Sequence, residues 1–408
     1  MGDRLRSMSH FTRREALKLS LLTGAMPFVR HGELPRLRTD RLRLGIIGVG
    51  NRGAANLAAV SHEHVVALCD VDDRYLKNAA NQHQDAATFR DYREMLDADL
   101  DLDAVVVSTP DHTHAPASMA AMQRGLHCYC EKPLTHSVEE AKAMATLGQD
   151  LVTQMGTQIH AGDNYRRVVE LMRTKPIGNV TEVHVWCGKD WSGGRNSAPE
   201  QSVPEYLDWK LWLGDRADRP YRDGLHPGSW RRFWEFGGGT LADMGCHYMD
   251  LPFWALELGT PKVVTADAPE PAHPVGTPKD LHCTWTFDHQ GHELVFHWYD
   301  GSRRPDCLST LTYDSGQPVN WNSGVLFVGE DGMVLADYGR HYLLPEHQFV
   351  GFTPPPASIP SSIGHHREWL EAIRTGGPTT CHFAYSGNLT QTVLLGNQAY
   401  RAGGSLNL

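Results

Sequence analysis

The segment that begins at Thr240 carries the residues best suited to proton transfer. Asp243, His247 and Asp250 recur at intervals of four and three residues, so a helix capped by Thr240 would place all three on one face. Imidazole has an ordinary pKa of about 6.5, so His247 can take a proton from a hydroxyl group near neutral pH. Asp243 is expected to orient the imidazole and stabilise its charged form, and Pro252 predicts a kink just after the site. By itself the Asp-His pair is also typical of a surface pair or a core histidine.

A lysine follows a short predicted strand, His127 to Cys130, in the sequence Glu131-Lys132-Pro133. The proline restricts the backbone there, and the ammonium group can donate a hydrogen bond to a substrate hydroxyl. Without other evidence, a Lys-Pro pair would be interpreted as a surface turn.

A glycine-rich turn follows the first apolar run, Leu42 to Val49. Its sequence is Gly48-Val49-Gly50-Asn51-Arg52-Gly53, and a helix-compatible stretch comes next. Strand, glycine turn and helix in this order predict a dinucleotide site, because glycines let the backbone approach a pyrophosphate and the helix N-terminus receives its charge. The alternative is a glycine turn without a ligand.

Asp70 ends the next predicted strand, His64 to Cys69, and lies 17 residues after Gly53. A carboxylate in this place is suited to the ribose hydroxyl groups of an adenosine. Asp70, Asp72 and Asp73 together would repel a 2′-phosphate, so the sequence favours NAD over NADP.

Polar residues also follow the apolar strand predicted from Asp103 to Ser108. Thr109, Pro110, His112 and His114 lie at its carboxyl end, where open α/β sheets bind ligands. We expect these residues to contact the cofactor.

Taken in order, the glycine turn, Asp70, the Ser-Thr-Pro-Asp-His strand end and Glu131-Lys132-Pro133 resemble the N-terminal half of the Gfo/Idh/MocA family, which includes glucose-fructose oxidoreductase and inositol dehydrogenase. Asp243-x-x-x-His247 resembles the family's second catalytic motif. The resemblance runs from about Arg41 to the end of the chain, and it implies hydride transfer between NAD and a carbohydrate. It also implies that Lys132, Asp243 and His247 are the catalytic residues. The predicted cofactor-binding residues are Gly48, Gly50, Asn51, Arg52, Gly53, Asp70, Thr109, Pro110, His112, His114, Glu131, Lys132 and Gln158.

The expected fold is α/β, with two domains after an N-terminal segment of residues 1–40. Residues 41–155 are predicted to form a Rossmann domain, a doubly wound parallel sheet, and residues 156–408 an α+β substrate domain. Alternating apolar residues predict an open, mostly antiparallel sheet in the second domain. The family similarly uses such a sheet for oligomerisation, so a homo-oligomer is expected. The predicted strands of this domain are 181–187, 262–266, 281–287, 293–299, 325–328 and 333–336, and its predicted helices outside the motif are 164–173 and 366–375.

Tryptophan is concentrated before and within the predicted catalytic helix, with seven of the eleven residues from Trp186 to Trp254. Indole rings stack on the C–H faces of sugars, but they also suit a core. Trp209 and Trp212 are interpreted as packing residues. The predicted substrate-binding residues are Trp186, Trp191, Tyr221, His226, Trp230 and Arg231.

The composition excludes several classes of protein. The chain has 408 residues, 41% hydrophobic and 21% charged, which is typical of a globular protein with two domains. Its net charge of -10 disfavours nucleic acid and suits a neutral sugar. The eight cysteines form no Cys-x-x-Cys pair and no histidines are spaced as a ligand set, so we expect free thiols and no metal. No segment reaches the ~20 apolar residues of a membrane span.

Residues 1–40 resemble a twin-arginine export signal. Arg13 and Arg14 precede a mildly apolar run, Leu19 to Val29, which is too short for a permanent membrane span. We therefore expect an exported, periplasmic protein. The alternative is a basic amphipathic leader without an export role.

Export bears on the reaction. A folded protein can carry bound NAD out of the cytoplasm, but outside it there is no comparable pool of NAD and no comparable means of reoxidising NADH. An ordinary dehydrogenase that releases NADH would stall there. If bound NAD is to stay on the enzyme for about an hour, its Kd must be about 10⁻⁹ to 10⁻¹¹ M, which is attainable. The expected function is hydride transfer from a sugar ring hydroxyl to a tightly bound NAD that is restored within each cycle. Two alternatives are a redox-neutral glycoside hydrolase, which combines oxidation, elimination, water addition and reduction, and a non-catalytic sugar-binding protein.

Overall fold

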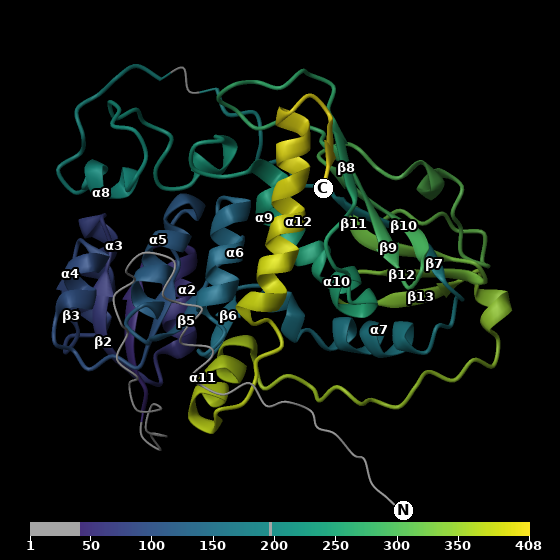
Figure 1. Cartoon of the computed structure of the whole chain (residues 1–408), viewed down its shortest axis with the longest axis horizontal. Coiled ribbons are helices and arrows are strands. Elements are labelled where there is room, and N and C mark those ends of the chain that lie inside the picture. The colour runs from purple at the N-terminus through teal and green to yellow at the C-terminus, as the bar shows by residue number, and fades with distance from the viewer. Residues whose placement is uncertain (1–40, 196–197) are drawn as a thin grey trace, which may run out of the picture. The chain divides into compact units, whose positions relative to one another are not determined.

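The computed structural model describes residues 41–195 and 198–408, which form two β-sheets with helices around and between them (Figure 1). The predicted export signal lies outside the described residues. Within the described part of the chain, no helix has the length and apolar character needed to cross a bilayer. All eight cysteines are free thiols.

The first sheet consists of six parallel strands, β1 (Arg43–Ile47), β2 (His64–Cys69), β3 (Ala87–Phe89), β4 (Ala104–Val107), β5 (His127–Cys130) and β6 (Thr153–Met155). Their order is β3-β2-β1-β4-β5-β6, the arrangement of a doubly wound Rossmann fold. Every residue of β4, Ala-Val-Val-Val, is buried, because helices cover both faces of the sheet. The predicted parallel sheet is confirmed.

The helices that connect these strands are α2 (Arg52–Val60), α3 (Asp73–Gln82), α4 (Tyr92–Asp97), α5 (Asp111–Met122) and α6 (Val138–Leu147). Apolar side chains of α2 and α3 pack on one face of the sheet together with Trp369 and Leu370 of the much later helix α11 (His365–Thr375). On the other face, α5 and α6 pack in a core shared with α12 (Phe383–Arg401). The first sheet is therefore covered partly by segments that lie far away in the sequence.

The second sheet has eight strands, β7 (Val180–Cys187), β8 (Val263–Asp267), β9 (His282–His289), β10 (His292–Asp300), β11 (Ser323–Gly329), β12 (Gly332–Ala336), β13 (His341–Leu344) and β14 (Ser405–Asn407). Their order is β13-β12-β11-β7-β10-β9-β8-β14, and all neighbours are antiparallel except β7 and β10. Alternation along β9 buries Cys283, Trp285 and Phe287 on the face that packs against helices. The predicted mostly antiparallel sheet is confirmed, and β13 and β14 were not predicted.

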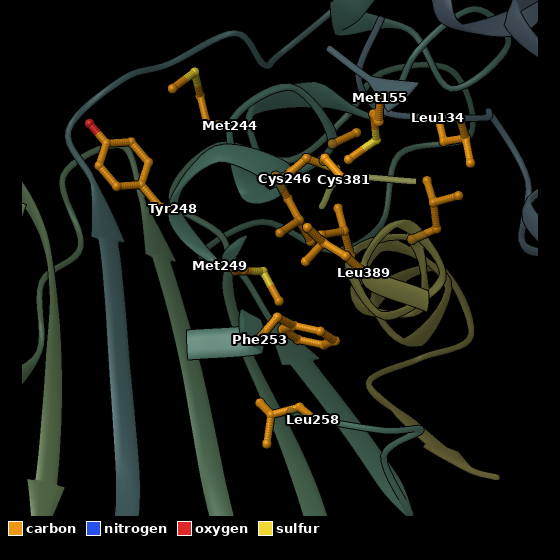
Figure 2. Close-up of a cluster of buried hydrophobic side chains, with 14 of the residues drawn as sticks. Leu134, Met155, Met244, Cys246, Tyr248, Met249, Phe253, Leu258, Cys381 and Leu389 are labelled. Carbon is orange, nitrogen blue, oxygen red and sulfur yellow. The ribbon is translucent and has the colours of Figure 1, made fainter. Parts of the chain in front are cut away.

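The remaining helices are α7 (Asp163–Arg173), α8 (Trp209–Leu213), α9 (Gly239–Tyr248) and α10 (Asp250–Leu256), with the 3-10 helices η2 (Gln158–Ala161), η3 (Ser229–Arg232), η4 (Asp306–Ser309) and η5 (Glu346–Phe349). Helix α12 stands between α6 and the second sheet (Figure 1). Figure 2 shows Cys246, Met249 and Phe253 of the α9–α10 segment close to Leu389 of α12. The sequence did not predict α12, because its buried residues surround most of its circumference and leave no single apolar stripe.

The predicted catalytic helix is present, but it begins differently from the prediction. Helix α9 begins at Gly239 without a side-chain cap, because the Thr240 hydroxyl instead accepts a hydrogen bond from the Trp191 backbone N–H, 2.8 Å away. The predicted cap at Thr240 is therefore wrong. The helix is interrupted at Met249, and α10 follows with Pro252 in its first turn, in agreement with the predicted kink.

The turn between β1 and α2 leaves no room for a side chain at its last position. A β-carbon at Gly53 would lie 2.0 Å from the carbonyl oxygen of Gly48. We expect Gly53→Ala to force the turn open and to lower the free energy of unfolding by about 1 to 3 kcal/mol, the usual cost of overpacking. Urea denaturation measures this loss.

The matched control is Gly259→Ala, because nothing lies within 4 Å of a β-carbon at that position. An equal loss of stability in the two variants would contradict the steric explanation.

Candidate active site

A cavity of about 870 Å³ lies at the carboxyl ends of the parallel strands and is closed by residues of η3 and α9. Open α/β sheets bind ligands at this edge. The predicted cofactor-binding residues that line it are Gly48, Gly50, Asn51, Arg52, Asp70, Thr109, Pro110, His114, Glu131, Lys132 and Gln158.

Asp70 fixes the glycine turn. Its two carboxylate oxygens accept hydrogen bonds from the backbone N–H groups of Val49 and Asp72, each 2.9 Å away. Burial raises the pKa of this carboxyl from its ordinary value, and the two hydrogen bonds offset part of the rise. Each oxygen keeps a second lone pair, so the position suits the predicted ribose contact.

The acids that follow Asp70 are paired with arginine side chains. Asp72 accepts a hydrogen bond from Arg74 at 2.7 Å, and Asp73 pairs with Arg90. Their charges are therefore compensated, and the predicted repulsion of a 2′-phosphate rests chiefly on Asp70.

Glu131 connects the end of β5 with α2 and η2. Its Oε1 atom accepts hydrogen bonds from Gln158 at 2.8 Å, Asn56 at 3.0 Å and Arg52 at 3.1 Å. Burial acts to raise the pKa of this carboxyl, but the charges of Arg52 and Lys132 outweigh it and hold the pKa below its usual value. Three predicted cofactor residues, Arg52, Glu131 and Gln158, thus form one network in the cavity wall.

The two histidines that follow β4 lie in different surroundings. The ring nitrogens of His114 lie 2.8 Å from the carbonyl oxygens of Thr109 and Pro133, and the ring lines the cavity. His112 Nε2 lies 2.8 Å from the carbonyl oxygen of Trp212, and burial lowers the pKa of His112 to about 3. Because residues two apart on a helix face different sides, the structure does not bring His112 to the predicted cofactor site.

Lys132 and Asp243 form a buried ion pair. Lys132 Nζ donates hydrogen bonds to Oδ1 of Asp243 at 2.6 Å and to its backbone oxygen at 2.8 Å, while Arg231 Nε donates to the same Oδ1 at 3.0 Å. Burial acts to raise the pKa of Asp243, but the charges of Lys132 and Arg231 outweigh it, so the pKa lies well below its ordinary value. An ammonium group has three N–H bonds, so Lys132 keeps one for a ligand.

His247 lines the cavity one helical turn beyond Asp243 but is not hydrogen-bonded to it. Its Nδ1 atom is buried and has no hydrogen-bond partner among residues 41–195 and 198–408. Burial, aided by the charge of Lys132, lowers the pKa of His247 to about 3, so the imidazole is uncharged at neutral pH. The structure corrects the prediction that Asp243 orients His247, because the bond to Lys132 directs this carboxylate elsewhere and leaves only its charge to act on the imidazole.

Asp111, the first residue of α5, lines the cavity; it belongs to the predicted strand-end motif, but the sequence analysis assigned it no role in the site. Its exposed fraction is 3%, and no ion pair of the described residues includes it. Burial raises the pKa of this carboxyl to about 7, against the opposing charges of Arg231 and Lys132. The position at a strand end could have identified it, but an acidic residue is also common in the first turn of a helix.

Three of the six predicted substrate-binding residues line the cavity. Trp230 and Arg231 do so together, with the guanidinium group 4.2 Å from the centre of the indole ring. His226 belongs to the nucleotide end, because its Nε2 donates a hydrogen bond to Asp72 at 2.8 Å and its ring lies 6.1 Å from that of Tyr75.

The other three, Trp186, Trp191 and Tyr221, do not line the cavity. Trp186 belongs to β7, where alternation points it away from α9, and its indole N–H donates a hydrogen bond to the Trp321 carbonyl at 2.8 Å. Tyr221 packs edge-on against Trp209, and Trp191 is 40% exposed to solvent. The structure therefore does not bring these three residues to the cavity.

Lys189, Met244 and Tyr338 also line the cavity and were not predicted as site residues. Lys189 Nζ lies 3.8 Å from Sδ of Met244, and Tyr338 stacks on Tyr248 at 4.7 Å. Tyr338 comes from the connection between β12 and β13, and no spacing in the sequence links that segment to the motifs.

The strand ends fit NAD. A β-carbon at Gly48, whose φ is 84°, would lie 2.7 Å from the backbone oxygen of Ser108, so only glycine allows the turn to offer its backbone to a pyrophosphate. Arg52 begins α2, where a helix N-terminus receives negative charge. Asp70 would hold the ribose, and Glu131, with its network, would form the wall beside the nicotinamide half.

Two models of one oxidoreductase family match the chain. The first, described as the NAD-binding Rossmann fold, matches residues 42–156, and the second, described as the C-terminal alpha/beta domain, matches residues 172–297. A glycosyl hydrolase family 109 protein of Shewanella sp. (strain W3-18-1) is 33% identical over 209 residues, which cover 48% of this chain and 40% of that protein. The chain thus spans less than half the length of this relative.

Solved structures share the fold over most of the chain. The WlbA dehydrogenase from Bordetella pertussis, in complex with NADH and UDP-GlcNAcA, has a TM-score of 0.61 at 18% identity and covers 90% of this chain and 99% of its own. Levoglucosan dehydrogenase, in complex with NADH and L-sorbose, has a TM-score of 0.59 at 19% identity and the same coverage, 90% and 99%. At these identities the likeness shows the fold alone. Because the two family models together match more than half of its residues, this chain belongs to the Gfo/Idh/MocA family of oxidoreductases, with an NAD-binding Rossmann half.

Proposed function

We propose that this protein oxidises a ring hydroxyl group of a sugar by hydride transfer to a tightly bound NAD, and that the cofactor is restored within the same catalytic cycle. The observation that carries the proposal is the ion pair of Lys132 with Asp243 and the uncharged His247, both in the cavity that also holds the glycine turn. A non-catalytic sugar-binding protein has no need of an ammonium group and a neutral imidazole in this arrangement.

Each of these side chains has a distinct task. NAD, when bound, takes a hydride from the carbon that carries the reacting hydroxyl and can return it. Lys132 donates its free N–H to the hydroxyl oxygen and stabilises the negative charge that develops there. His247 accepts the hydroxyl proton. A pKa of about 3 suffices for this step, because the hydroxyl becomes strongly acidic as the carbon–hydrogen bond breaks.

A sugar is the substrate class that best suits the site. Trp230 offers a ring face next to the guanidinium group of Arg231, which can donate further hydrogen bonds. The solved dehydrogenases of the same fold carry UDP-GlcNAcA and L-sorbose, so carbohydrate ligands occur in proteins built like this one.

Retention of NAD follows from the proposed export. If residues 1–40 direct the folded protein to the periplasm, NAD lost there is not replaced, and the enzyme depends on restoring its own cofactor. A second sugar that accepts the hydride would achieve this.

Redox-neutral cleavage of a glycoside is the second candidate. It is supported by the relative named as a glycosyl hydrolase family 109 protein and by Asp111, a cavity carboxylate without an ion-pair partner in the described residues. In this cycle the ketone formed at C3 acidifies the C2–H bond, the aglycone leaves C1, water adds, and the ketone is reduced again. No reducing equivalent leaves the enzyme.

Asp70→Asn is expected to weaken NAD binding. Loss of charge-assisted hydrogen bonds to the ribose costs about 1.5 to 3 kcal/mol, or about 10- to 150-fold in Kd. Calorimetric titration of cofactor-stripped protein with NAD measures the change. Asp85→Asn, at an exposed carboxylate, is the control, and an unchanged affinity of Asp70→Asn would place the ribose elsewhere.

Lys132→Met and His247→Gln are each expected to lower kcat/KM by about 10²-fold or more, because the reacting oxygen loses its cation or its proton acceptor. Both variants should still contain NAD, which the absorbance of the cofactor reports. Melting temperatures are needed as well, because Lys132→Met leaves the buried Asp243 with Arg231 alone. Lys210→Met, at an exposed position of α8, is the control, and retained activity in either site variant would refute the role of that residue.

The purified enzyme is expected to turn over without added NAD and to release NAD when it is denatured, as mass spectrometry of the supernatant would show. Incubation with an aryl glycoside in D₂O then separates the two candidates. Hydride exchange between two sugars leaves C2–H intact and changes oxidation states, whereas redox-neutral cleavage introduces deuterium at C2. Strict dependence on supplied NAD, with NADH accumulating in solution, would overturn the retained cofactor.

A further inference from the structure

We propose that Asp111 is the acid–base group that removes and returns the C2 proton of a 3-keto sugar. The inference rests on the proposed function, in its redox-neutral form. His247 and Lys132 act on the hydroxyl oxygen at C3, so a separate group is needed for the neighbouring carbon.

Asp111 has the position that this task requires. It is the first residue of α5, directly after the strand end that carries Thr109 and Pro110, and it lines the same cavity as Lys132 and His247. Its exposed fraction of 3% means that bulk water hardly reaches it. A ligand in the cavity would meet this carboxylate in a largely dry environment.

The other carboxylates that line the cavity are already engaged. Asp70 accepts two backbone hydrogen bonds at the nucleotide end, and Glu131 accepts hydrogen bonds from three side chains. Asp243 is bound to Lys132 and keeps a low pKa, so it is a poor base. Of these four acids, Asp111 alone accepts no hydrogen bond from another described residue and forms no ion pair.

Charged groups from three elements lie around Asp111 and, together with burial, determine its pKa. Arg231 of η3 and Lys132 after β5 favour the carboxylate, whereas burial and Asp243 of α9 favour the acid, and the pKa rises to about 7. The group therefore exists in both forms at neutral pH. One form can take a proton from carbon, and the other can give it back.

The chemical steps balance without an external oxidant. The Asp111 carboxylate takes the C2 proton, the electron pair of that bond forms a C1=C2 double bond, and the C1–O bond breaks. The departing aglycone oxygen keeps its electron pair and takes a proton from water. A second water molecule enters the site and adds its oxygen to C1. The proton on Asp111 exchanges with this water before Asp111 returns a proton to C2, and the proton lost by the added water replaces the one given to the aglycone.

The test starts from a 3-keto glycoside in D₂O, so it does not depend on the oxidation step. Wild-type enzyme should introduce deuterium at C2, observed by proton NMR, and Asp111→Asn should slow this exchange by about 10²-fold or more. Reduction of bound NAD by the unoxidised glycoside should fall by no more than about tenfold in Asp111→Asn, because the asparagine keeps the shape and polarity of the site. A purely structural role would lower both rates together. Asp85→Asn, at an exposed carboxylate, should exchange at the wild-type rate.

The pH profile gives an independent readout. The exchange rate of the wild type should rise with pH up to about 7 and level off above it, because only the ionised Asp111 is a base. The rate of NAD reduction should not rise with pH over the same range, because His247, with a pKa of about 3, is already uncharged there.

The outcomes distinguish this inference from the proposed function. Exchange by Asp111→Asn at the wild-type rate, or no exchange by the wild type, would overturn the role of Asp111. Failure of the proposed oxidation would be seen separately, as the absence of NAD reduction by the sugar.

Discussion

The buried ion pair between Lys132 and Asp243 connects the two halves of the site. The residues are 111 positions apart, one after β5 of the parallel sheet and the other on α9. Removing two charges from water is costly, and the cost is offset only when the geometry is good and the remaining groups are hydrogen-bonded. Here Arg231 also binds the carboxylate, and the Asp243 backbone oxygen accepts a second bond from Lys132. The relative position of the two halves is thereby tied to the charge state of the predicted catalytic residues.

The pair also sets the electrostatics of its neighbours. The charge of Lys132 helps to keep His247 neutral and acts to lower the pKa of Asp111, which burial raises to about 7. Asp243 and Asp111 are both buried carboxylic acids, but one stays ionised and the other titrates near neutrality. Environments that separate the pKa values of similar groups are how one site provides both a fixed charge and a proton carrier.

The motifs that could be predicted from the sequence are those whose chemistry depends on residues that are close together along the chain. The glycine turn, Asp70, Lys132 and His247 follow or lie within elements that their own neighbours define, and the strand-end rule brings the first three to one edge of the sheet. The partner of a side chain is a different matter. The four-residue spacing on α9 predicted that Asp243 pairs with His247. In the fold, Asp243 instead binds Lys132, a stronger partner that comes from another element.

The other differences arise where the sequence gives neither the register of a strand nor a motif or pattern that marks the segment. Trp186 is on a correctly predicted strand, but whether a strand residue faces α9 or the opposite side depends on the register of the sheet, which a single sequence does not give. Tyr338 reaches the cavity from a connection with no motif of its own. Helix α12 is buried on so many sides that the amphipathic pattern of a surface helix is missing.

The place of α11 has a consequence for how the protein is made. Trp369 covers the same face of the first sheet as α2, its indole N–H donates a hydrogen bond to the Val152 carbonyl at 3.2 Å, and the His365 ring lies 2.8 Å from the Met155 carbonyl oxygen. A ribosome synthesises the six strands of this sheet, with α2 and α3, long before it reaches α11, so the part of this face that Trp369 and Leu370 bury stays uncovered while some 200 further residues are translated. The core on this side of the first sheet therefore cannot be completed until α11 has been made, and a complete nucleotide-binding half is a sign that translation has passed that helix.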